Sequence, residues 1–496
     1  MTSQNTPLPD DASGLAETLS PDALPDATFV PPPQAAAPEP FERLELPAAV
    51  LANLARLGYH TMTPIQAAAL PVALGGYDLI AQARTGSGKT AAFGLPLLQR
   101  LDGRRFAVQA LVLCPTRELA EQVSQELRRL ARAEDNIKIL SLCGGSPIRP
   151  QADSLAHGAH VVVGTPGRLL DHLARGTLQL DNLATLVLDE ADRMLDMGFF
   201  DDIAQVVAAC PRGRQTLLFS ATYPPGVVRL ARQFMRQPQV IALPEQHAED
   251  TIRQRFYEVA PEQRLHAVGL LLRHYRPDSA LAFCNTRQQC RDLVEALAAD
   301  GVQALALHGE LDQRERDQVM VRFANRSCSV LVATDVAARG LDIAGLAAVI
   351  NVDLSHDPEV HVHRVGRTGR AGEDGWALSL ATPNEKSRVA AIAAAQGFVP
   401  VWESLADLEA EAAPPLEAPM VTLQILGGRK DKIRPGDVLG ALTGEAGLAA
   451  AQIGKINVND QSTYVAVARE VAARALKRLG EGKIKGRKVR VRLLDE

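Results

Sequence analysis

The sequence predicts an α/β protein with two tandem, doubly wound parallel-sheet domains and a smaller C-terminal α+β domain. Short apolar runs alternate with polar turns and helical stretches across residues 41–246, and the alternation restarts across residues 247–400. Such alternation is typical of parallel sheets that carry helices on both faces. The length of 496 residues is enough for about three domains.

The expected strands are short apolar runs that lead into polar or glycine-containing turns. In the first domain they are 77–82, 109–114, 160–164, 185–188 and 216–219, and in the second they are 279–284, 303–307, 329–333, 348–353 and 376–381. The carboxyl ends of parallel strands share one edge of a sheet, where open α/β folds bind ligands. We therefore expect the polar turns to gather at that edge.

Three further segments differ from the two sheet domains in composition. Residues 1–40 carry proline and alanine clusters with scattered acids and no apolar period, which predicts a disordered tail. Residues 401–418 are rich in Ala, Glu and Pro and are expected to be a linker. Residues 419–496 should form the α+β domain. Its expected strands are 421–426, 453–458, 463–467 and 488–493, and its expected helix is 468–479.

Composition argues against membrane, secreted and zinc-binding proteins. Apolar residues make up 46% of the chain, but no run approaches the ~20 residues of a membrane span. The first residues include acids and lack a basic start and an apolar segment, so we expect no secretory leader and a cytoplasmic location. The six cysteines form no CxxC pair, which favours reduced thiols over a zinc site.

Charge is distributed unevenly along the chain. The formal net charge is −5, yet residues 420–496 hold 15 Lys and Arg against 8 Asp and Glu, a balance of +7. A basic domain on an acidic body predicts an appendage that binds a polyanion, although a solvated basic surface would give the same balance.

A phosphate-binding loop is predicted at Thr85-Gly86-Ser87-Gly88-Lys89-Thr90, after the strand that contains Leu79, Ile80 and Ala81. Its glycines would let backbone amides approach phosphates, and the following helix would add positive potential. Lys89 would meet the β- and γ-phosphates, and Thr90 would ligate Mg²⁺. The usual pattern begins with glycine, and Ala83 stands at that position.

Two acids, Asp189 and Glu190, follow the apolar run Leu186-Val187-Leu188. Acids after a strand are most often part of a solvated loop. A phosphate loop about 100 residues earlier makes them the expected second half of a nucleoside triphosphatase site. Asp189 would hold Mg²⁺, and Glu190 would activate water.

The segment His363-Arg364-Val365-Gly366-Arg367-Thr368-Gly369-Arg370 places three arginines at three-residue spacing on one side of a turn or helix start. Such donors can stabilise the charge on a phosphoryl group in transfer. A surface cluster, or one that binds nucleic-acid phosphates, is the alternative. Only closure of a cleft between the two sheet domains would bring these arginines to the triphosphate.

Together these motifs resemble the DEAD-box ATP-dependent RNA helicases, whose name the tetrapeptide Asp189-Glu190-Ala191-Asp192 spells. The match covers residues 41–400 in order and implies two RecA-like domains. The motifs are Gly58-Tyr59, Thr63-Pro64-Ile65-Gln66, the phosphate loop, Pro115–Ala120, Gly144-Gly145, Thr165–Arg168, Asp189–Asp192, Ser220-Ala221-Thr222, Ala333-Thr334-Asp335 through Asp342, and His363–Arg370.

The resemblance implies that Gln66 reads the adenine edge while Phe41 stacks on the base; Tyr59 stands where Phe is commoner. It implies ATP-binding roles for Phe41, Tyr59, Thr63, Gln66, Ala83, Arg84, Thr85, Gly86, Ser87, Gly88, Lys89, Thr90, Gly340 and Asp342. Arg367 and Arg370 would join Lys89, Asp189 and Glu190 in catalysis.

The resemblance also implies residues that contact the RNA backbone and residues that couple hydrolysis to strand separation. Those on RNA would be Pro115, Thr116, Arg117, Glu118, Gly145, Thr165, Pro166, Gly167, Arg168 and Thr334; those in coupling would be Asp192, Ser220, Thr222 and His363. Backbone contacts carry little sequence information but can favour RNA through its 2′-OH.

The C-terminal domain resembles the RNA-binding domain of DbpA-type bacterial helicases, an RRM-like fold. The carrying residues are 434–444, 453–456 and 483–488. Tyr464 is the single aromatic residue in 420–496, so stacking aromatics of a standard RRM are missing and recognition should depend on charge and shape. Lys483, Lys485, Arg487 and Lys488 are candidates for phosphate contacts, with a solvated strand edge as the alternative.

We therefore expect a monomeric RNA-dependent ATPase that uses ATP and Mg²⁺ to open short RNA duplexes. The resemblance of its last domain implies a hairpin of 23S rRNA and 50S assembly intermediates as partners. An ATP-gated RNA clamp, or a generic RNA helicase or chaperone without rRNA preference, is the alternative. The RNA-type motif set argues against a DNA helicase.

Overall fold

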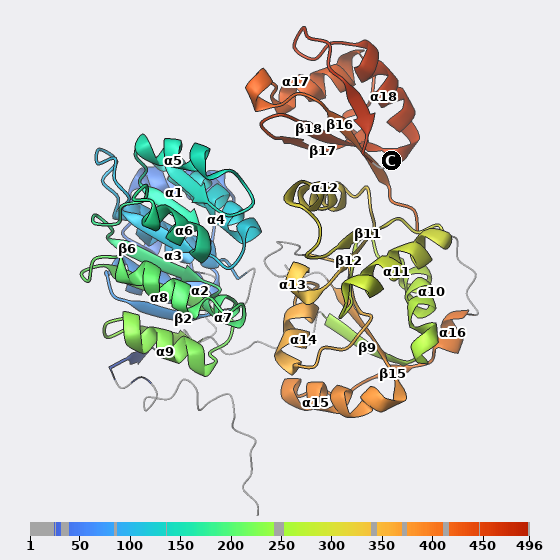
Figure 1. The fold of residues 1–496 in the computed structure, drawn as a ribbon, viewed down its shortest axis with the longest axis horizontal. Helices are drawn as coiled ribbons and strands as arrows, with labels where there is room; N and C mark the ends of the chain where they lie inside the picture. Colours follow the sequence, from blue (N-terminus) through green and yellow to red (C-terminus); the bar gives the residue numbers. More distant parts are fainter. Residues whose placement is uncertain are drawn as a thin grey trace, which may run out of the picture. The chain divides into compact units, whose positions relative to one another are not determined.

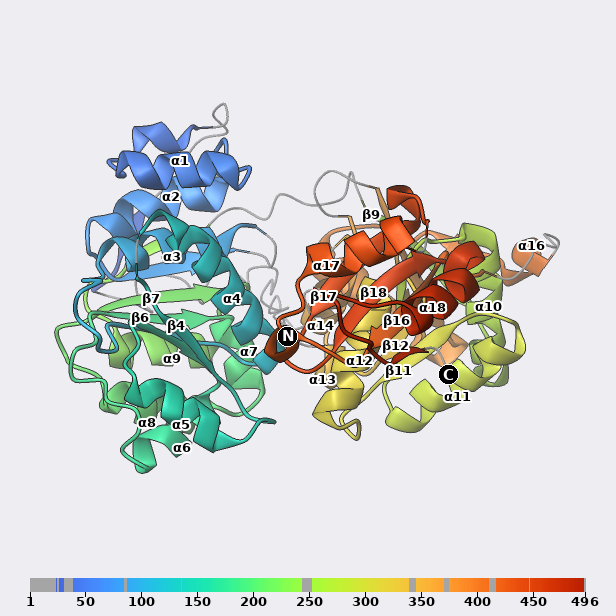
Figure 2. The ribbon, with the colours of Figure 1, turned by 90° about the horizontal axis from the view of Figure 1, so that it is seen from above.

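The structure is a computed structural model that describes residues 24, 26–30, 39–83, 87–134, 136–242, 252–338, 345–369, 374–409, 416–445 and 447–494. These residues fall into two compact units, one that contains the described residues up to 242 and one that contains those from 252 onward. Figures 1 and 2 show the elements of each unit along the chain. Within the described ranges, none of the helices has the length and apolar character that a membrane crossing requires.

The first unit is built on a parallel sheet with strand order β1-β8-β2-β7-β6-β3-β5-β4. The strands are β1 (Thr28–Val30), β2 (Leu79–Gln82), β3 (Ala110–Leu113), β4 (Ile139–Leu142), β5 (Val161–Gly164), β6 (Thr185–Asp189), β7 (Gln215–Ser220) and β8 (Gln239–Ala242). The central strands are apolar throughout because helices cover both faces of the sheet.

Two hydrophobic clusters assign the helices of the first unit to opposite faces of its sheet. One face carries α1 (Ala48–Arg56), α2 (Pro64–Leu74), α3 (Lys89–Gln99) and α4 (Arg117–Leu130). The other carries α5 (Ile148–Ala156), α6 (Pro166–Ala174), α7 (Ala191–Asp196), α8 (Phe200–Ala208) and α9 (Pro225–Phe234).

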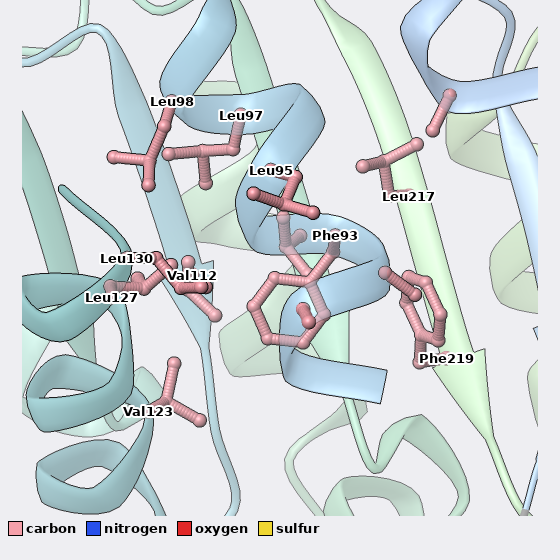
Figure 3. Close-up of a cluster of buried hydrophobic side chains, with 14 of the residues drawn as sticks. Phe93, Leu95, Leu97, Leu98, Val112, Val123, Leu127, Leu130, Leu217 and Phe219 are labelled. Carbon is pink, nitrogen blue, oxygen red and sulfur yellow. The ribbon is translucent and has the colours of Figure 1, made fainter. Parts of the chain in front are cut away.

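The packing of α3 fixes the start of that helix against the sheet. Figure 3 shows Phe93 of α3 between side chains of α4 and Phe219 of β7. The ring centroids of Phe93 and Phe219 lie 5.4 Å apart in an edge-on arrangement. A buried aromatic pair of this kind is specific in geometry as well as apolar. It anchors a helix whose first residue is Lys89.

The second unit contains another parallel sheet, with strand order β11-β12-β10-β13-β14-β9-β15. Its strands are β9 (Ile252–Glu258), β10 (Ala280–Phe283), β11 (Ala304–Leu307), β12 (Val330–Ala333), β13 (Ala348–Asn351), β14 (Gly375–Ala381) and β15 (Trp402–Glu403). Its helices are α10 (Arg264–Tyr275), α11 (Arg287–Ala299), α12 (Gln313–Ala324), α13 (Asp335–Ala338), α14 (Pro358–Val365), α15 (Lys386–Gln396) and α16 (Leu405–Glu409). The expected RecA-like pair of α/β domains is confirmed.

The small domain that ends the second unit has the expected α+β fold. Its elements are β16 (Met420–Ile425), α17 (Pro435–Gly440), β17 (Ile453–Val458), β18 (Thr463–Ala468), α18 (Ala472–Glu481) and β19 (Val491–Leu493). The sheet is antiparallel with order β17-β18-β16-β19. Apolar residues of α17 and α18 pack on one face of it, which gives the RRM-like arrangement.

Two expectations about the flanking segments are wrong in part. Within residues 1–40, Thr28–Val30 form β1, which pairs in parallel with β8, because the backbone can extend an open sheet edge. Within residues 401–418, β15 pairs with β9 and Leu408 of α16 is buried in the core. Glu403 holds this segment by accepting hydrogen bonds from Tyr257 and Tyr275.

Candidate active site

The acids of the predicted hydrolytic site stand at the carboxyl end of the central strand β6. Asp189 is the last residue of β6 and is 3% exposed. Glu190 follows as the N-cap of α7, with φ 53° and ψ 54°, and is 5% exposed. A left-handed backbone is uncommon for a residue other than glycine. The fold therefore buries two adjacent carboxylates at the carboxyl end of β6.

Lys89 begins α3 directly after β2 and the phosphate loop. Gly88 precedes it with φ +90°, and a Cβ there would lie 2.4 Å from Nε2 of Gln66, so only glycine fits. Lys89 is 6% exposed, and its Nζ has no hydrogen-bond partner among the described residues. Burial of a charged ammonium group costs free energy unless a partner, such as a bound ligand, accepts its hydrogen bonds.

Burial also changes the electrostatics of Asp189. It raises the pKa of this carboxyl from 3.8 to about 6, while nearby Lys89 opposes the rise and Glu190 adds to it. Oδ1 of Asp189 has no hydrogen-bond partner among the described residues. Buried polar atoms nearly always have a hydrogen-bond partner. Nζ of Lys89 and Oδ1 of Asp189 therefore fit a ligand that brings both negative oxygens and a hard cation. A magnesium–triphosphate complex has that chemistry.

The residues predicted to read adenine contact the phosphate loop itself. Gln66 donates from Nε2 to the Gly88 carbonyl at 3.0 Å and accepts from the Thr63 amide at 2.9 Å. The Thr63 hydroxyl donates to the Ser87 carbonyl at 2.8 Å. The start of α2 is thus tied to the loop that precedes α3.

The two aromatic residues predicted at the adenine pack against each other. Phe41 is 2% exposed and lies edge-on to Tyr59, with ring centroids 6.2 Å apart. The Tyr59 hydroxyl donates to Glu126, and burial, with that carboxylate, raises the pKa of the phenol. Stacking of Phe41 on an adenine base stays a prediction.

Asp192 connects the end of β6 to the end of β7. Its Oδ2 accepts from the amides of Ala221 and Thr222 at 3.0 and 2.9 Å and from the Thr222 hydroxyl at 3.1 Å. Its own amide donates to the Ser220 hydroxyl. The expected tie between the acidic turn and the Ser220–Thr222 segment is present.

Glu190 has a buried partner that the sequence did not indicate. Nη1 of Arg193 lies 2.5 Å from Oε2 of Glu190. Arg193 follows the acids at the spacing of one helical turn, which was the only signal available in the sequence.

The residues predicted to contact RNA in the first unit follow the neighbouring strands β3, β5 and β4. Thr116 and Thr165 are the N-caps of α4 and α6. Pro115 and Pro166 are buried; Thr116, Arg117, Glu118, Thr165 and Arg168 are half-buried; Gly145 and Gly167 are exposed. Two helix N-termini at one sheet edge offer backbone amides to phosphates. The nucleotide and RNA candidates thus occupy separate halves of this edge.

Arg168 forms hydrogen bonds within the first unit. Its guanidinium donates to the Ser146 carbonyl at 3.0 Å and to Oε1 of Gln151 at 2.9 Å. This arginine therefore supports the loop that contains Gly145. Gln151, which the sequence did not indicate, also bonds to the Cys143 carbonyl and to His172.

One of the three evenly spaced arginines of the second unit lies in the domain core. Arg364 is 2% exposed and forms a bidentate pair with Asp335, at 2.6 and 2.7 Å. That pair supports the turn after Thr334, which is half-buried. His363 is half-buried and Arg367 is buried in the same unit. Arg370 lies outside the described residues, so the expectation that all three arginines face one way stays a prediction.

Six of the predicted ATP-binding and catalytic residues lie outside the described residues: Arg84, Thr85, Gly86, Gly340, Asp342 and Arg370. Ala83 is buried at the end of β2, while Ser87 and Thr90 are half-buried beside Lys89.

Two loops of the C-terminal domain carry groups of exposed basic residues. Lys483, Lys485, Arg487 and Lys488 are exposed. Lys485 donates to the Lys432 carbonyl at 2.8 Å, which joins this turn to the loop after β16. That loop adds the exposed residues Arg429, Lys430, Lys432 and Arg434, which the sequence interpretation had not assigned to RNA. Lys and Arg in such loops are typical phosphate contacts.

The face of the C-terminal sheet that lies opposite α17 and α18 is covered around β16. Thr422 and Gln424 of β16 are 0% and 2% exposed. Thr422 accepts from Asn325, which follows α12 in the same unit, at 3.1 Å. Arg469 donates to Oε1 of Gln303 at 2.6 Å. In an RRM-like domain this sheet face would bind bases, and here it is closed around Thr422. The basic loops are therefore the candidate RNA contacts of this domain.

Comparison with known families divides the chain in the same way. Residues 63–230 match the DEAD/DEAH box helicase family, residues 263–372 match the helicase conserved C-terminal domain, and residues 422–493 match the DbpA RNA binding domain.

Individual relatives match over most of the chain. It is 55% identical over 449 residues to the ATP-dependent RNA helicase DbpA of Escherichia coli, covering 90% of this chain and 98% of that one. It is 44% identical over 346 residues to the DEAD-box ATP-dependent RNA helicase CshA of Geobacillus kaustophilus, covering 70% and 74%. The structure of S. cerevisiae Dbp5 bound to RNA and ADP BeF3 aligns with a TM-score of 0.69 at 31% identity, covering 75% and 97%.

Proposed function

The chain belongs to the DEAD-box ATP-dependent RNA helicases, and on that premise we propose that Lys89, Asp189 and Glu190 hydrolyse ATP when RNA is bound, so that short RNA duplexes open locally. The observation that carries the site assignment is a pair of buried atoms, Nζ of Lys89 at the start of α3 and Oδ1 of Asp189 at the end of β6, which have no hydrogen-bond partner among the described residues.

Each residue has a separate task in the proposed mechanism. Lys89 donates to the β- and γ-phosphates, while Thr90 and Asp189 supply oxygen ligands for Mg²⁺. When bound, the cation supplies charge neutralisation to the phosphates. Glu190 orients the attacking water and accepts its proton. Arg367 and Arg370 add positive charge at the γ-phosphate, as the family resemblance implies.

Asp192 transmits the state of this site to the RNA. It follows Glu190 by two residues and holds the Ser220–Thr222 segment through four hydrogen bonds. A shift of the acidic turn during hydrolysis therefore moves the loop after β7. Strand separation depends on this connection in our proposal, with His363 as a further coupling residue from the second unit.

The C-terminal domain directs the enzyme to its RNA. Its match to the DbpA RNA binding domain and its two basic loops support binding of a 23S rRNA hairpin in 50S assembly intermediates. We propose that a cytoplasmic monomer acts there. Phosphate contacts position the domain, and the shape of the hairpin selects it.

The test is ATP hydrolysis by the full chain in the presence of a 23S rRNA fragment, an unrelated RNA of equal length, or DNA, at matched salt. The rRNA fragment should stimulate best and DNA least. A variant with Lys483→Gln, Arg487→Gln and Lys488→Gln should lose the preference between the two RNAs.

A matched control removes three exposed charges elsewhere in the same domain, by Arg474→Gln, Lys477→Gln and Arg478→Gln on α18. This variant should keep the preference. Equal stimulation of the unmodified chain by both RNAs would indicate a generic RNA helicase, and tight ATP-dependent RNA binding without unwinding would indicate a clamp.

A further inference from the structure

We propose that Arg193 is a positioning residue for hydrolysis, because its guanidinium holds the carboxylate of Glu190 at the carboxyl end of β6. This inference rests on the proposed role of Glu190 as the group that activates water. It concerns a side chain that lies one helical turn after the acids and contacts the reacting groups only through Glu190.

The ion pair is short and shielded from solvent. Nη1 of Arg193 lies 2.5 Å from Oε2 of Glu190, and the two side chains are 9% and 6% exposed. The amide of Arg193 also donates to Oδ1 of Asp192 at 2.9 Å. One residue therefore contacts the water-activating acid through its side chain and the coupling acid through its backbone.

A second arginine–glutamate pair of the same spacing, in α4, is more exposed to solvent than the pair of Arg193 and Glu190. Arg129 and Glu126 also pair across three residues of a helix, but their side chains are 48% and 18% exposed. Exposed helical pairs contribute little, and solvent screens them. Arg193 and Glu190 are largely withdrawn from water, so loss of the arginine removes a buried opposite charge from beside this carboxylate.

Position matters at Glu190 because its backbone is already constrained. Its left-handed φ of 53° directs the start of α7, and the side chain still has three rotatable bonds. The ion pair restricts those bonds and thus fixes where the carboxylate can meet a water molecule. A misplacement of about 1 Å in a catalytic group can lower a rate by about 10²-fold.

The test compares steady-state ATP hydrolysis by full-length variants at saturating poly(U). Arg193→Gln should lower kcat by ~10–100-fold while KM for ATP stays within about threefold. Arg193→Lys, which keeps the charge, should recover most of kcat. Arg214→Gln is the control, since Arg214 is also buried in the first unit but donates to backbone carbonyls of Pro211 and Phe234. It should leave kcat unchanged.

The same changes in a Glu190→Gln background separate positioning from general support of the fold. If Arg193 acts through Glu190, Arg193→Gln should not slow the residual single-turnover rate further. An equal slowing in both backgrounds would overturn the proposal, as would a normal kcat in Arg193→Gln or a Lys variant as slow as the Gln variant.

Two safeguards complete the experiment. If Arg193→Gln does not melt cooperatively, Arg193→Met, which keeps an unbranched side chain without the charge, takes its place in both backgrounds and is judged by the same criteria. Wild-type hydrolysis by Glu190→Gln would contradict the proposed role of Glu190 itself. A slow Glu190→Gln variant beside a normal Arg193→Gln variant would contradict only the inference about Arg193.

Discussion

The carboxylate of Asp192 accepts hydrogen bonds from both the amide and the hydroxyl of Thr222, at 2.9 and 3.1 Å. The two residues are 30 positions apart and follow adjacent strands, β6 and β7. A single oxygen atom thus joins the acidic turn to the loop assigned to strand separation.

Thr222→Val should uncouple the two activities. Valine keeps the hydrogen bond from the backbone amide to Asp192 and loses the one from the hydroxyl. RNA-stimulated ATP hydrolysis should therefore persist, while the rate of duplex unwinding should fall by about tenfold. Both rates are measured on the same preparation. Thr216→Val, a substitution of the same kind on β7, should change neither activity. Parallel loss of both activities in Thr222→Val would contradict separate coupling.

Asp189→Asn should raise the Mg²⁺ concentration needed for half-maximal hydrolysis by about tenfold or more, because an amide oxygen is a weaker ligand for a hard cation. Phosphate release is measured across a Mg²⁺ titration, and chelation with EDTA should abolish it in the unmodified chain. Asp181→Asn, at an exposed position, is the control. An unchanged Mg²⁺ requirement in Asp189→Asn would remove this residue from the cation site.

His361 should make the second unit less stable in acid. It is fully buried, and neither ring nitrogen has a hydrogen-bond partner among the described residues. Burial, with Arg364 nearby, lowers its pKa from 6.5 to about 3. The unfolded state therefore binds more protons between these values, so stability is lost as pH falls below about 6.5. Linkage gives a loss of about 1.4 kcal/mol at pH 5.5.

Tryptophan fluorescence during urea unfolding measures this effect directly, because both tryptophans, Trp376 and Trp402, belong to the second unit. His361→Phe, which suits an apolar site beside Phe256, should reduce the loss between pH 7.5 and 5.5. His266→Gln, at an exposed position, should retain it. An undiminished pH dependence in His361→Phe would show that other groups cause it.

The sequence was sufficient for the fold class and for much of the site, since strong apolar runs and polar turns coincide there. Strands β2, β3, β5, β6 and β7 lie within a residue or two of their expected positions. Five strands of the two parallel sheets, β1, β4, β8, β9 and β15, were not foreseen. In β4 and β9 polar residues interrupt the apolar ones, and periodicity alone does not identify such strands.

Side-chain partners were harder to foresee than strands. Three evenly spaced arginines looked equivalent, yet Arg364 pairs with Asp335 inside the domain. Arg193 escaped notice because its contact with Glu190 depends on a left-handed backbone that the residue type does not indicate. Phe29 and Trp402 fell in segments whose composition suggested a tail and a linker, and pairing with β8 and β9 overrode that composition.

The most direct test of the central claim is RNA-stimulated ATP hydrolysis by the full chain with Lys89→Ala. Nζ of Lys89 is a buried cation of the proposed site with no hydrogen-bond partner in the part of the chain that the structure describes, so its removal should reduce phosphate release to background at every RNA concentration. Lys138→Ala, which removes a side chain that donates to the Ser154 carbonyl, should retain the unmodified rate. Hydrolysis by Lys89→Ala at the unmodified rate would contradict the assignment of the nucleotide site.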